Sequence, residues 1–286
     1  MNILSLKKIT LKWKDEEYPY TVEVSENANF IEAQTFSCST NSCNLENLKI
    51  GWTYYWRVNG GEVHSFGTEN NGTRFMRVDG LRNVRDLGGR KIKQSLIYRG
   101  SEMEGNNYRI IEEGKRVVTE VMKIKTELDL RREFYAEGMM SPVEGVVMKQ
   151  IPYRPYMEVF EDQHKQALLE IMEFLSDENN YPIYFHCMGG ADRTGMIAMY
   201  LQALVGESEE DIFLDYELTS LSRIPMLDST TVEGYRSRNY DYFTEFLDEL
   251  KKYAPNESLQ SQIKAFLMEC GVTEECMKKI INILKI

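Results

Sequence analysis

The stretch from Tyr181 to Val205 constrains the fold of this chain more than any other. The run from Tyr181 to Phe185 is apolar, which is typical of a buried strand, and it leads into a glycine-containing turn. The segment from Gly195 to Val205 carries no charged side chain, which indicates a helix buried on every side. A strand, a glycine-rich turn and a buried helix in succession predict an α/β domain built around this unit.

Helical patterns on both sides of this unit support the α/β assignment. Apolar residues recur at helical spacing between His164 and Leu175. Gly206 is expected to end the central helix, and Ser208 to cap the next one. The tail from Asp241 to Ile286 is helical in pattern as well. We therefore expect a central sheet flanked by helices over residues 73–286.

The first part of the chain has the pattern of short strands instead. Apolar and polar residues alternate in Ile9–Trp13 and again in Tyr20–Val24. The run Tyr54–Val58 ends at Asn59-Gly60-Gly61, which is a strong hairpin-turn signal, and a further short run follows it. Several strands at short spacing without a helical segment predict a small all-β sandwich.

This first segment, residues 1–72, is similar to a fibronectin type III domain. The resemblance rests on residues 53–58, Thr-Tyr-Tyr-Trp-Arg-Val, followed by residues 65–68, Ser-Phe-Gly-Thr. Its aromatic residues could form a partner surface, although the sandwich core is the favoured place for most of them: Trp52, Tyr54, Tyr55 and Trp56. We expect the domain to dock on the catalytic domain or on a protein partner. Residues 69–72, Glu-Asn-Asn-Gly, are polar and turn-rich and predict a boundary between domains 1–72 and 73–286.

The turn before the buried helix carries the candidate site. It reads His186-Cys187-Met188-Gly189-Gly190-Ala191-Asp192-Arg193-Thr194-Gly195. At the amino end of a helix, unpaired backbone N–H groups and the helix dipole favour an anion. The same field favours the thiolate of Cys187, which makes this residue a candidate nucleophile. Arg193 can donate two hydrogen bonds to two phosphate oxygens, and Thr194 can donate its hydroxyl to the thiolate.

Each of these residues also has an ordinary structural interpretation. A buried cysteine is more often a packing residue than a nucleophile, two glycines are common in turns, and His186 could be a core histidine. The combination favours function, because all of these residue types stand where one phosphate-binding loop requires them. The predicted phosphate-binding residues are Met188, Gly189, Gly190, Ala191 and Arg193.

Residues 187–193 match the C-x5-R signature of cysteine-dependent phosphatases. More narrowly, the loop resembles that of the bacterial tyrosine/serine protein phosphatase family, H-C-x-x-G-K-D-R-T-G. Residues 80–89, 96–101 and 124–131 are similar to its N-F-R-D-L-G-G, L-Y-R-S and I-x-T-x-x-D-L-R motifs. The resemblance covers roughly residues 74–286 and implies the cysteine-dependent phosphatase fold. It also implies hydrolysis of phosphomonoesters through a phosphocysteine, with no metal and no other cofactor.

Within these motifs, Arg85, Asp86 and Arg99 are expected to brace the phosphate loop rather than to react. The chain departs from the family pattern at Val84, where Phe is usual, and at Ala191, where Lys is common. Without that Lys cation, a highly charged phosphoinositide headgroup is a poorer substrate. A phosphotyrosine-like monoester in a protein or peptide is the preferred substrate class.

The general acid has two candidates. Asp129 is the first choice, because a loop at the end of a strand can project it over the phosphate; alternatively it pairs with Arg131 or Arg132. Asp192 is the second choice, because myotubularin-like phosphatases have an Asp at that position; alternatively it holds the loop. Residues 153–156, Tyr-Arg-Pro-Tyr, could line a substrate entrance, although an aromatic surface turn is the favoured interpretation.

Three other functions compete with a protein phosphatase. A phosphoinositide phosphatase would need a basic rim, and Ala191 counts against it. A catalytically weak phosphopeptide-binding module would have no physical need for Cys187 and Arg193. A rhodanese-type sulfurtransferase also uses a loop cysteine, but the continuation from Asp192 to Gly195 favours a phosphatase.

Composition and charge limit the expected binding partners and cellular location of the protein. Its 34 Lys and Arg residues against 45 Asp and Glu give a net charge of −11, which makes nucleic-acid binding a poor fit. No apolar run reaches the ~18 residues of a membrane-spanning helix. Charges from Lys12 onward come too early for a secretory leader, so a cytoplasmic location is expected. A secreted protein whose leader had been removed would have the same sequence.

Overall fold

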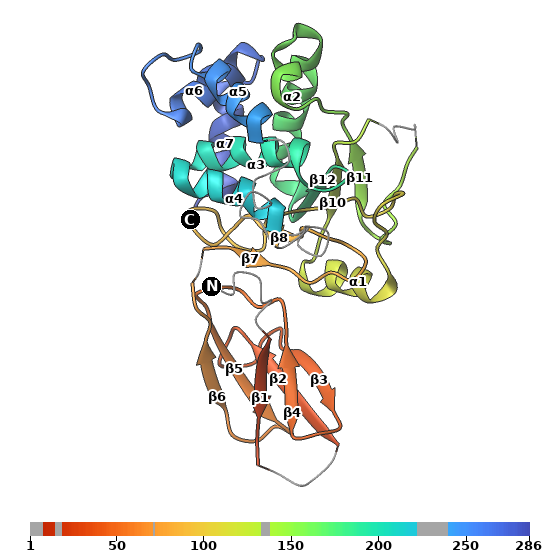
Figure 1. Cartoon of the computed structure of the whole chain (residues 1–286). Coiled ribbons are helices and arrows are strands. Elements are labelled where there is room, and N and C mark those ends of the chain that lie inside the picture. Colours follow the sequence, from red (N-terminus) through yellow and green to blue (C-terminus); the bar gives the residue numbers. More distant parts are fainter. Residues whose placement is uncertain (1–7, 15–18, 71, 133–137, 222–239) are drawn as a thin grey trace, which may run out of the picture. The chain divides into compact units, whose positions relative to one another are not determined.

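A computed structural model describes most of the chain (Figure 1). The described residues are 8–14, 19–70, 72–132, 138–221 and 240–286. The chain divides into two compact units, residues 1–76 and 77–286. Each unit has a hydrophobic core of its own.

The described part of the first unit up to residue 70 consists of strands and turns without a helix. One sheet pairs β1 (Ile9–Lys12) with β4 (Ser42–Leu45), and the other has the order β3-β2-β5-β6. The strands of the second sheet are β2 (Tyr20–Ser25), β3 (Gln34–Cys38), β5 (Thr53–Val58) and β6 (His64–Gly67). The alternating runs thus form strands, as the sequence predicts. The fibronectin-like sandwich and the boundary after residue 72 stay predictions.

The core of the first unit follows from the alternation along its strands. Inward-facing residues are buried in each sheet: Leu11, Val22, Val24, Cys43, Leu45 and Tyr54. The predicted turn follows β5, where Asn59 and Gly60 have φ of 47° and 70°, a backbone region that Asn and Gly tolerate best.

The second unit is built on a largely parallel sheet with helices around it (Figure 1). Its strands have the order β11-β10-β12-β9-β8, in which β9, β12, β10 and β11 run parallel and β8 is antiparallel to β9. Their bounds are β8 (Arg85–Asp86), β9 (Ile97–Gly100), β10 (Thr126–Asp129), β11 (Val147–Gln150) and β12 (Ile183–His186), and β7 (Arg74–Phe75) precedes them. The register places the last residue of β12, His186, between Asp129 and Gly100. The carboxyl ends of β9, β10 and β12 therefore lie side by side at one edge of the sheet.

The helices follow the sequence pattern closely. Their bounds are α1 (Glu112–Arg116), η1 (Val117–Val121), η2 (Tyr156–Phe160), α2 (Asp162–Leu175), η3 (Glu178–Asn180), α3 (Asp192–Val205), α4 (Glu209–Leu221), α5 (Tyr240–Leu250), α6 (Leu259–Glu269) and α7 (Glu274–Leu284). In the described part of the chain, none of these helices has the length and apolar character to span a membrane.

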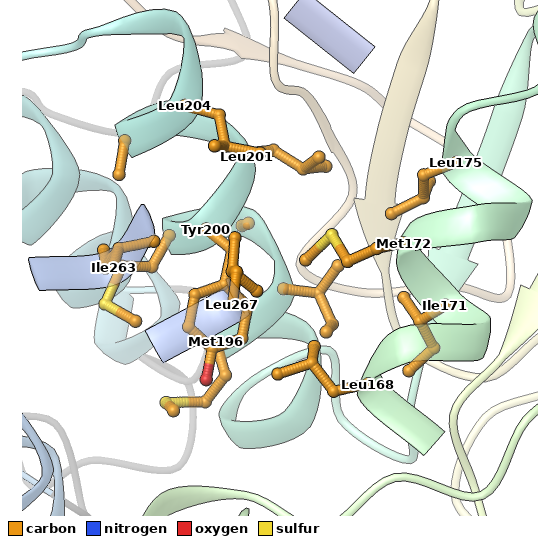
Figure 2. Close-up of a cluster of buried hydrophobic side chains, with 14 of the residues drawn as sticks. Leu168, Ile171, Met172, Leu175, Met196, Tyr200, Leu201, Leu204, Ile263 and Leu267 are labelled. Carbon is orange, nitrogen blue, oxygen red and sulfur yellow. The ribbon is translucent and has the colours of Figure 1, made fainter. Parts of the chain in front are cut away.

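Helix α3 is the centre of the second unit. Every residue from Thr194 to Val205 is buried, which confirms the prediction from its uncharged sequence. Figure 2 shows apolar side chains of α3 meeting those of α2 and α6. Gly206 ends the helix in the left-handed conformation, with φ of 84°, and the Ser208 hydroxyl accepts a hydrogen bond from the Asp211 N–H at 3.1 Å. Both end signals are therefore confirmed.

Candidate active site

The predicted nucleophile and phosphate-binding residues lie on the loop that joins β12 to α3 and in the first turn of that helix. Cys187 follows the strand directly and is 3% exposed. Gly190 has φ of 65°, and a Cβ atom there would lie 2.3 Å from the carbonyl oxygen of Gly100 on β9. Only glycine fits both the backbone conformation and the space. The close approach of loop and strand explains why a glycine stands at this position.

Three consecutive carbonyl groups of the loop accept hydrogen bonds from the surrounding framework, and the next one accepts the first hydrogen bond of α3. The Glu102 N–H donates to Met188 O at 3.0 Å, and the Asn83 side chain donates to Gly189 O at 3.3 Å and Gly190 O at 2.9 Å. The Gly195 N–H donates to Ala191 O at 2.7 Å, and Arg99 donates to Gly190 O at 2.8 Å. Within a trans peptide the N–H points away from the C=O. The loop N–H groups therefore face the opposite side, where an anion would be bound.

Two buried arginines and one carboxylate hold this framework together. Asp215 accepts hydrogen bonds from Arg85 at 2.7 Å and from Arg99 at 2.5 Å. Although burial disfavours its charge, the two guanidinium groups outweigh burial and lower the pKa of Asp215. Burial together with Arg85 lowers the pKa of Arg99 to about 10, so Arg99 is still a cation at neutral pH. Two cations facing one anion leave a positive charge behind the loop.

Asp86 lies apart from the phosphate loop in a turn of its own. Its carboxylate accepts hydrogen bonds from the Gly88 N–H at 2.8 Å and from the Ser95 N–H at 2.7 Å, and so shapes the connection from β8 to β9. Thr194, which was expected to donate to the thiolate, is fully buried, and its hydroxyl has no hydrogen-bond partner in the described structure.

His186 is fully buried beside two carboxylates of β10. Its Nε2 lies 2.8 Å from Glu127 Oε1, and its Nδ1 lies 3.0 Å from the carbonyl oxygen of Cys187 and 3.8 Å from Asp129 Oδ1. Burial alone would lower the pKa of His186, but Asp129 and Glu127 outweigh it and raise the pKa above its ordinary value. As a cation, His186 can donate both to Glu127 and to the Cys187 carbonyl.

Asp129 forms a buried ion pair with Arg131, which is one of the two roles that the sequence left open for it. Arg131 donates to both of its oxygens at 2.8–3.0 Å, and the Gln150 side chain adds a hydrogen bond at 3.0 Å. Arg131 also bonds Glu102 at 2.9 Å. Asp129 is fully buried, so this geometry favours a structural carboxylate over one that faces substrate.

A cavity of about 560 Å³ opens at the other end of the loop. Its walls contain Asp192 and Arg193 from the first turn of α3 and Tyr242 and Glu245 from α5. Residues 153–156 line the same cavity, so they form part of a recess rather than a plain surface turn. Of the two candidate acids, Asp192 lies on the cavity wall and Asp129 does not. Cys187 is not among the described residues that line the cavity either, so the cavity adjoins the loop at Asp192 and Arg193.

Several residues of this arrangement had no role in the sequence analysis. Asn83 holds two loop carbonyls, Asp215 pairs two arginines and Glu127 contacts His186. The signal for Asn83 was its place in the N-x-R-D-L-G-G motif, two residues before Arg85. Asp215, together with Tyr216, matches the family pattern in sequence, but neither its role nor that of Glu127 follows from local sequence, because their partners lie 59 or more residues away along the chain.

Residues 76–284 match the profile of a family described as the tyrosine phosphatase family. The chain belongs to this family. Its activity is therefore that of a phosphatase, a hydrolase of phosphate esters. A search of curated proteins finds no match.

Among solved structures, this phosphatase is similar to three fungal and viral examples. The core catalytic domain of the PP-IP phosphatase SIW14 from S. cerevisiae, in complex with citrate, is 21% identical over 50% of this chain and 80% of that chain, with a TM-score of 0.33. Another SIW14 catalytic core is 18% identical over 63% and 96%, with a TM-score of 0.35. OH1 from the Orf virus, described as a tyrosine phosphatase with triple substrate specificity, is 16% identical over 62% and 84%, with a TM-score of 0.24.

Proposed function

We propose that this phosphatase hydrolyses phosphotyrosine in proteins or peptides through a phosphocysteine formed on Cys187. The observation that carries this proposal is the set of loop carbonyls held by Asn83, Arg99, Glu102 and Gly195. A loop fixed in this way presents its N–H groups before any substrate arrives, which is the preorganisation that stabilises charge in a transition state.

In the first step, a bond forms between the Cys187 sulfur and phosphorus while the bond from phosphorus to the tyrosyl oxygen breaks. Arg193 and the loop N–H groups bind the three other phosphate oxygens throughout. A general acid gives its proton to the departing oxygen, so tyrosine leaves as a neutral phenol.

We assign the acid to Asp192 rather than to Asp129. Support for Asp192 comes from its place on the cavity wall beside Arg193. Asp129 is engaged with Arg131 and Gln150, and a general acid must reach the leaving group. In the second step, the Asp192 carboxylate takes a proton from water, the water oxygen bonds to phosphorus, and the bond to sulfur breaks. Inorganic phosphate and the Cys187 thiolate result.

The charges around the cavity support a monoester substrate over a phosphoinositide headgroup. Three arginines line it, Arg132, Arg154 and Arg193, but Glu158, Asp192 and Glu245 line it as well. One of these arginines, Arg154, is paired with Glu158 at 2.7 Å. A multiply phosphorylated headgroup would meet as many carboxylates as cations here, whereas the tyrosine and proline side chains suit an aromatic ring.

We also propose that the first unit is a fibronectin type III-like module that binds a protein partner. Its sheet order β3-β2-β5-β6 is the order of one sheet of an immunoglobulin-like sandwich. Near the start of β5, the Tyr54 hydroxyl accepts a hydrogen bond from the Lys49 N–H at 2.8 Å. A tyrosine bonded to backbone a few residues upstream is typical of such sandwiches.

Phosphate release in the presence of EDTA tests the proposed reaction. We expect turnover of a phosphotyrosine peptide by the wild type and none by Cys187→Ser, because serine is not ionised at neutral pH. Cys38→Ser, a cysteine change in the first unit, is the matched control and should retain activity. A phosphoserine peptide and a phosphoinositide should be hydrolysed more slowly. Equal turnover by Cys187→Ser, or a preference for the phosphoinositide, would contradict the proposal.

A further inference from the structure

Two tyrosine hydroxyls and the carboxylate of Asp192 form a hydrogen-bonded series. The Tyr156 hydroxyl donates to Asp192 Oδ1 at 2.6 Å, and it is also in hydrogen-bond contact with the Tyr216 hydroxyl. Tyr156 is 8% exposed and Tyr216 is 4% exposed. The side chain to which we assign acid chemistry is therefore connected to the interior by a chain of three polar groups.

The direction of these hydrogen bonds follows from counting hydrogens. Burial, with Asp192 next to it, raises the pKa of Tyr156, so its phenol stays protonated across the range in which enzymes are assayed. A phenol has one hydrogen, and that of Tyr156 points to Asp192. The hydrogen between the two tyrosines must therefore come from Tyr216. The order is Tyr216 to Tyr156 to Asp192.

Packing fixes this chain from several elements. Tyr156 begins η2 with φ of 57°, a left-handed conformation that is strained for an aromatic residue. The Tyr216 ring, on α4, stacks on Phe243 of α5 with centroids 3.9 Å apart and planes within 8°. Gly195 lets α3 approach that ring, since a Cβ there would lie 2.9 Å from it. A strained backbone held by such packing is often found where a side chain must be placed for function.

We propose that Tyr156 is the positioning residue of the general acid, holding Asp192 Oδ1 so that Oδ2 carries the proton given to the leaving group. The inference rests on the proposed role of Asp192. The carbonyl-like oxygen of a neutral carboxyl group is the better acceptor, so a donor at Oδ1 directs the acidic hydrogen to Oδ2. As that proton leaves, negative charge develops on the carboxylate and the hydrogen bond from Tyr156 strengthens. Tyr156 thus favours the transition state over the ground state.

The test compares two leaving groups in the full chain. The value of kcat/KM covers the steps through phosphocysteine formation, and it is measured for p-nitrophenyl phosphate and for phenyl phosphate, whose leaving group has a tyrosine-like pKa of about 10. Tyr156→Phe should lower kcat/KM about tenfold for phenyl phosphate and less than about twofold for p-nitrophenyl phosphate, because a good leaving group hardly needs an acid. Tyr216→Phe should show the same selectivity with a smaller loss.

Tyr200→Phe is the matched control. This substitution also removes one hydroxyl from a buried tyrosine pair, since the hydroxyl oxygens of Tyr200 and Tyr153 lie 3.2 Å apart. The Tyr200 hydroxyl bonds Tyr153 and not Asp192. The substitution should lower the rates for the two substrates by the same factor or not at all. A selective loss in this control, or an equal loss for both substrates in Tyr156→Phe, would overturn the inference.

Asp192→Asn separates this inference from the proposed function. It should lower kcat/KM for phenyl phosphate about a hundredfold, with a smaller loss for p-nitrophenyl phosphate. If Asp192→Asn is selective and Tyr156→Phe is not, the positioning role is wrong and the acid assignment stands. If Asp192→Asn is not selective, both are wrong, while cysteine dependence is still decided by Cys187→Ser.

Discussion

His186 is a buried histidine whose charge is set by its neighbours. Glu127 and Asp129 face it from β10, and together they raise its pKa against the effect of burial and of Arg131. Its Nδ1 lies 3.0 Å from the Cys187 carbonyl oxygen, which can only accept, so His186 donates there and helps to orient the first peptide of the loop. In this geometry His186 supports the first peptide of the phosphate loop.

The raised pKa of His186 predicts a pH dependence of stability. The contribution is fully present below the unfolded value of about 6.5 and is lost as pH rises through the folded value. We expect the free energy of unfolding to fall as the pH rises above about 6.5, and to fall less in Glu127→Gln. Urea unfolding at several pH values measures it, with the exposed Glu144→Gln as control. The same slope in Glu127→Gln and wild type would contradict this account.

Asp129 and Asp192 should respond in opposite ways to the same substitution. Asp129→Asn leaves Arg131 buried without its main partner, so we expect a loss of about 3–5 kcal/mol in the free energy of unfolding. The folded variant should keep the wild-type ratio of rates on good and poor leaving groups. Urea unfolding and steady-state kinetics measure both quantities. Normal stability with a selective loss on poor leaving groups would restore Asp129 as the acid.

At the scale of elements, the phosphate loop depends on its close approach to β9. Gly190→Ala would place a Cβ 2.3 Å from Gly100 O, so we expect the loop to shift and phosphate-ester hydrolysis to fall by about a hundredfold or more. Gly145→Ala is the matched control, because Gly145 also has positive φ, 81°, and open space around it. It should cost about 1 kcal/mol of stability and leave kcat/KM unchanged. Equal kinetic effects of the two variants would contradict the importance of this contact.

The elements around the site were the most predictable part of the chain. The uncharged run that Gly206 ends defines α3 by local sequence alone, and Ser208 marks the start of α4 in the same way. In the first unit, Asn59-Gly60 marks a turn by local sequence as well. The role of Asp129 was not decided in this way. Its D-x-R spacing allowed both an ion pair with Arg131 and a position over the phosphate. The ion pair is completed by Glu102, which bonds Arg131, and by Gln150, which bonds Asp129, and both residues come from other parts of the chain.

The contact between Tyr156 and Asp192 was beyond sequence analysis for a similar reason. The two residues are 36 positions apart, and the turn at Tyr156 needs a left-handed backbone that tyrosine rarely adopts. Local preference therefore pointed to an ordinary surface turn. Long-range packing overrides such preferences, so residues that support a site are harder to predict than the loop motif itself.

At the scale of the whole molecule, the two units have separate cores and the chemistry lies in one of them. The core of the first unit includes Val22, while Cys187, Asp192 and Arg193 belong to the second. Val22→Ala should lower the stability of the first unit by about 2 kcal/mol and leave kcat/KM on phenyl phosphate unchanged. Calorimetry and steady-state kinetics check the two parts. A parallel loss of activity on this small substrate would show that catalysis depends on the first unit.

The central claim is that phosphate passes through a covalent bond to Cys187, and its most direct test is to trap that intermediate. Full-length Asp192→Asn is mixed with p-nitrophenyl phosphate in EDTA, because this good leaving group hardly needs an acid while hydrolysis of the phosphocysteine still needs the Asp192 carboxylate. The reaction is quenched with acid and analysed by peptide mass spectrometry, with Cys187→Ser as control. We predict one phosphoryl group on the peptide that contains Cys187 in the first protein and none in the control. Rapid release of phosphate without a phosphorylated Cys187 peptide would contradict the cysteine mechanism.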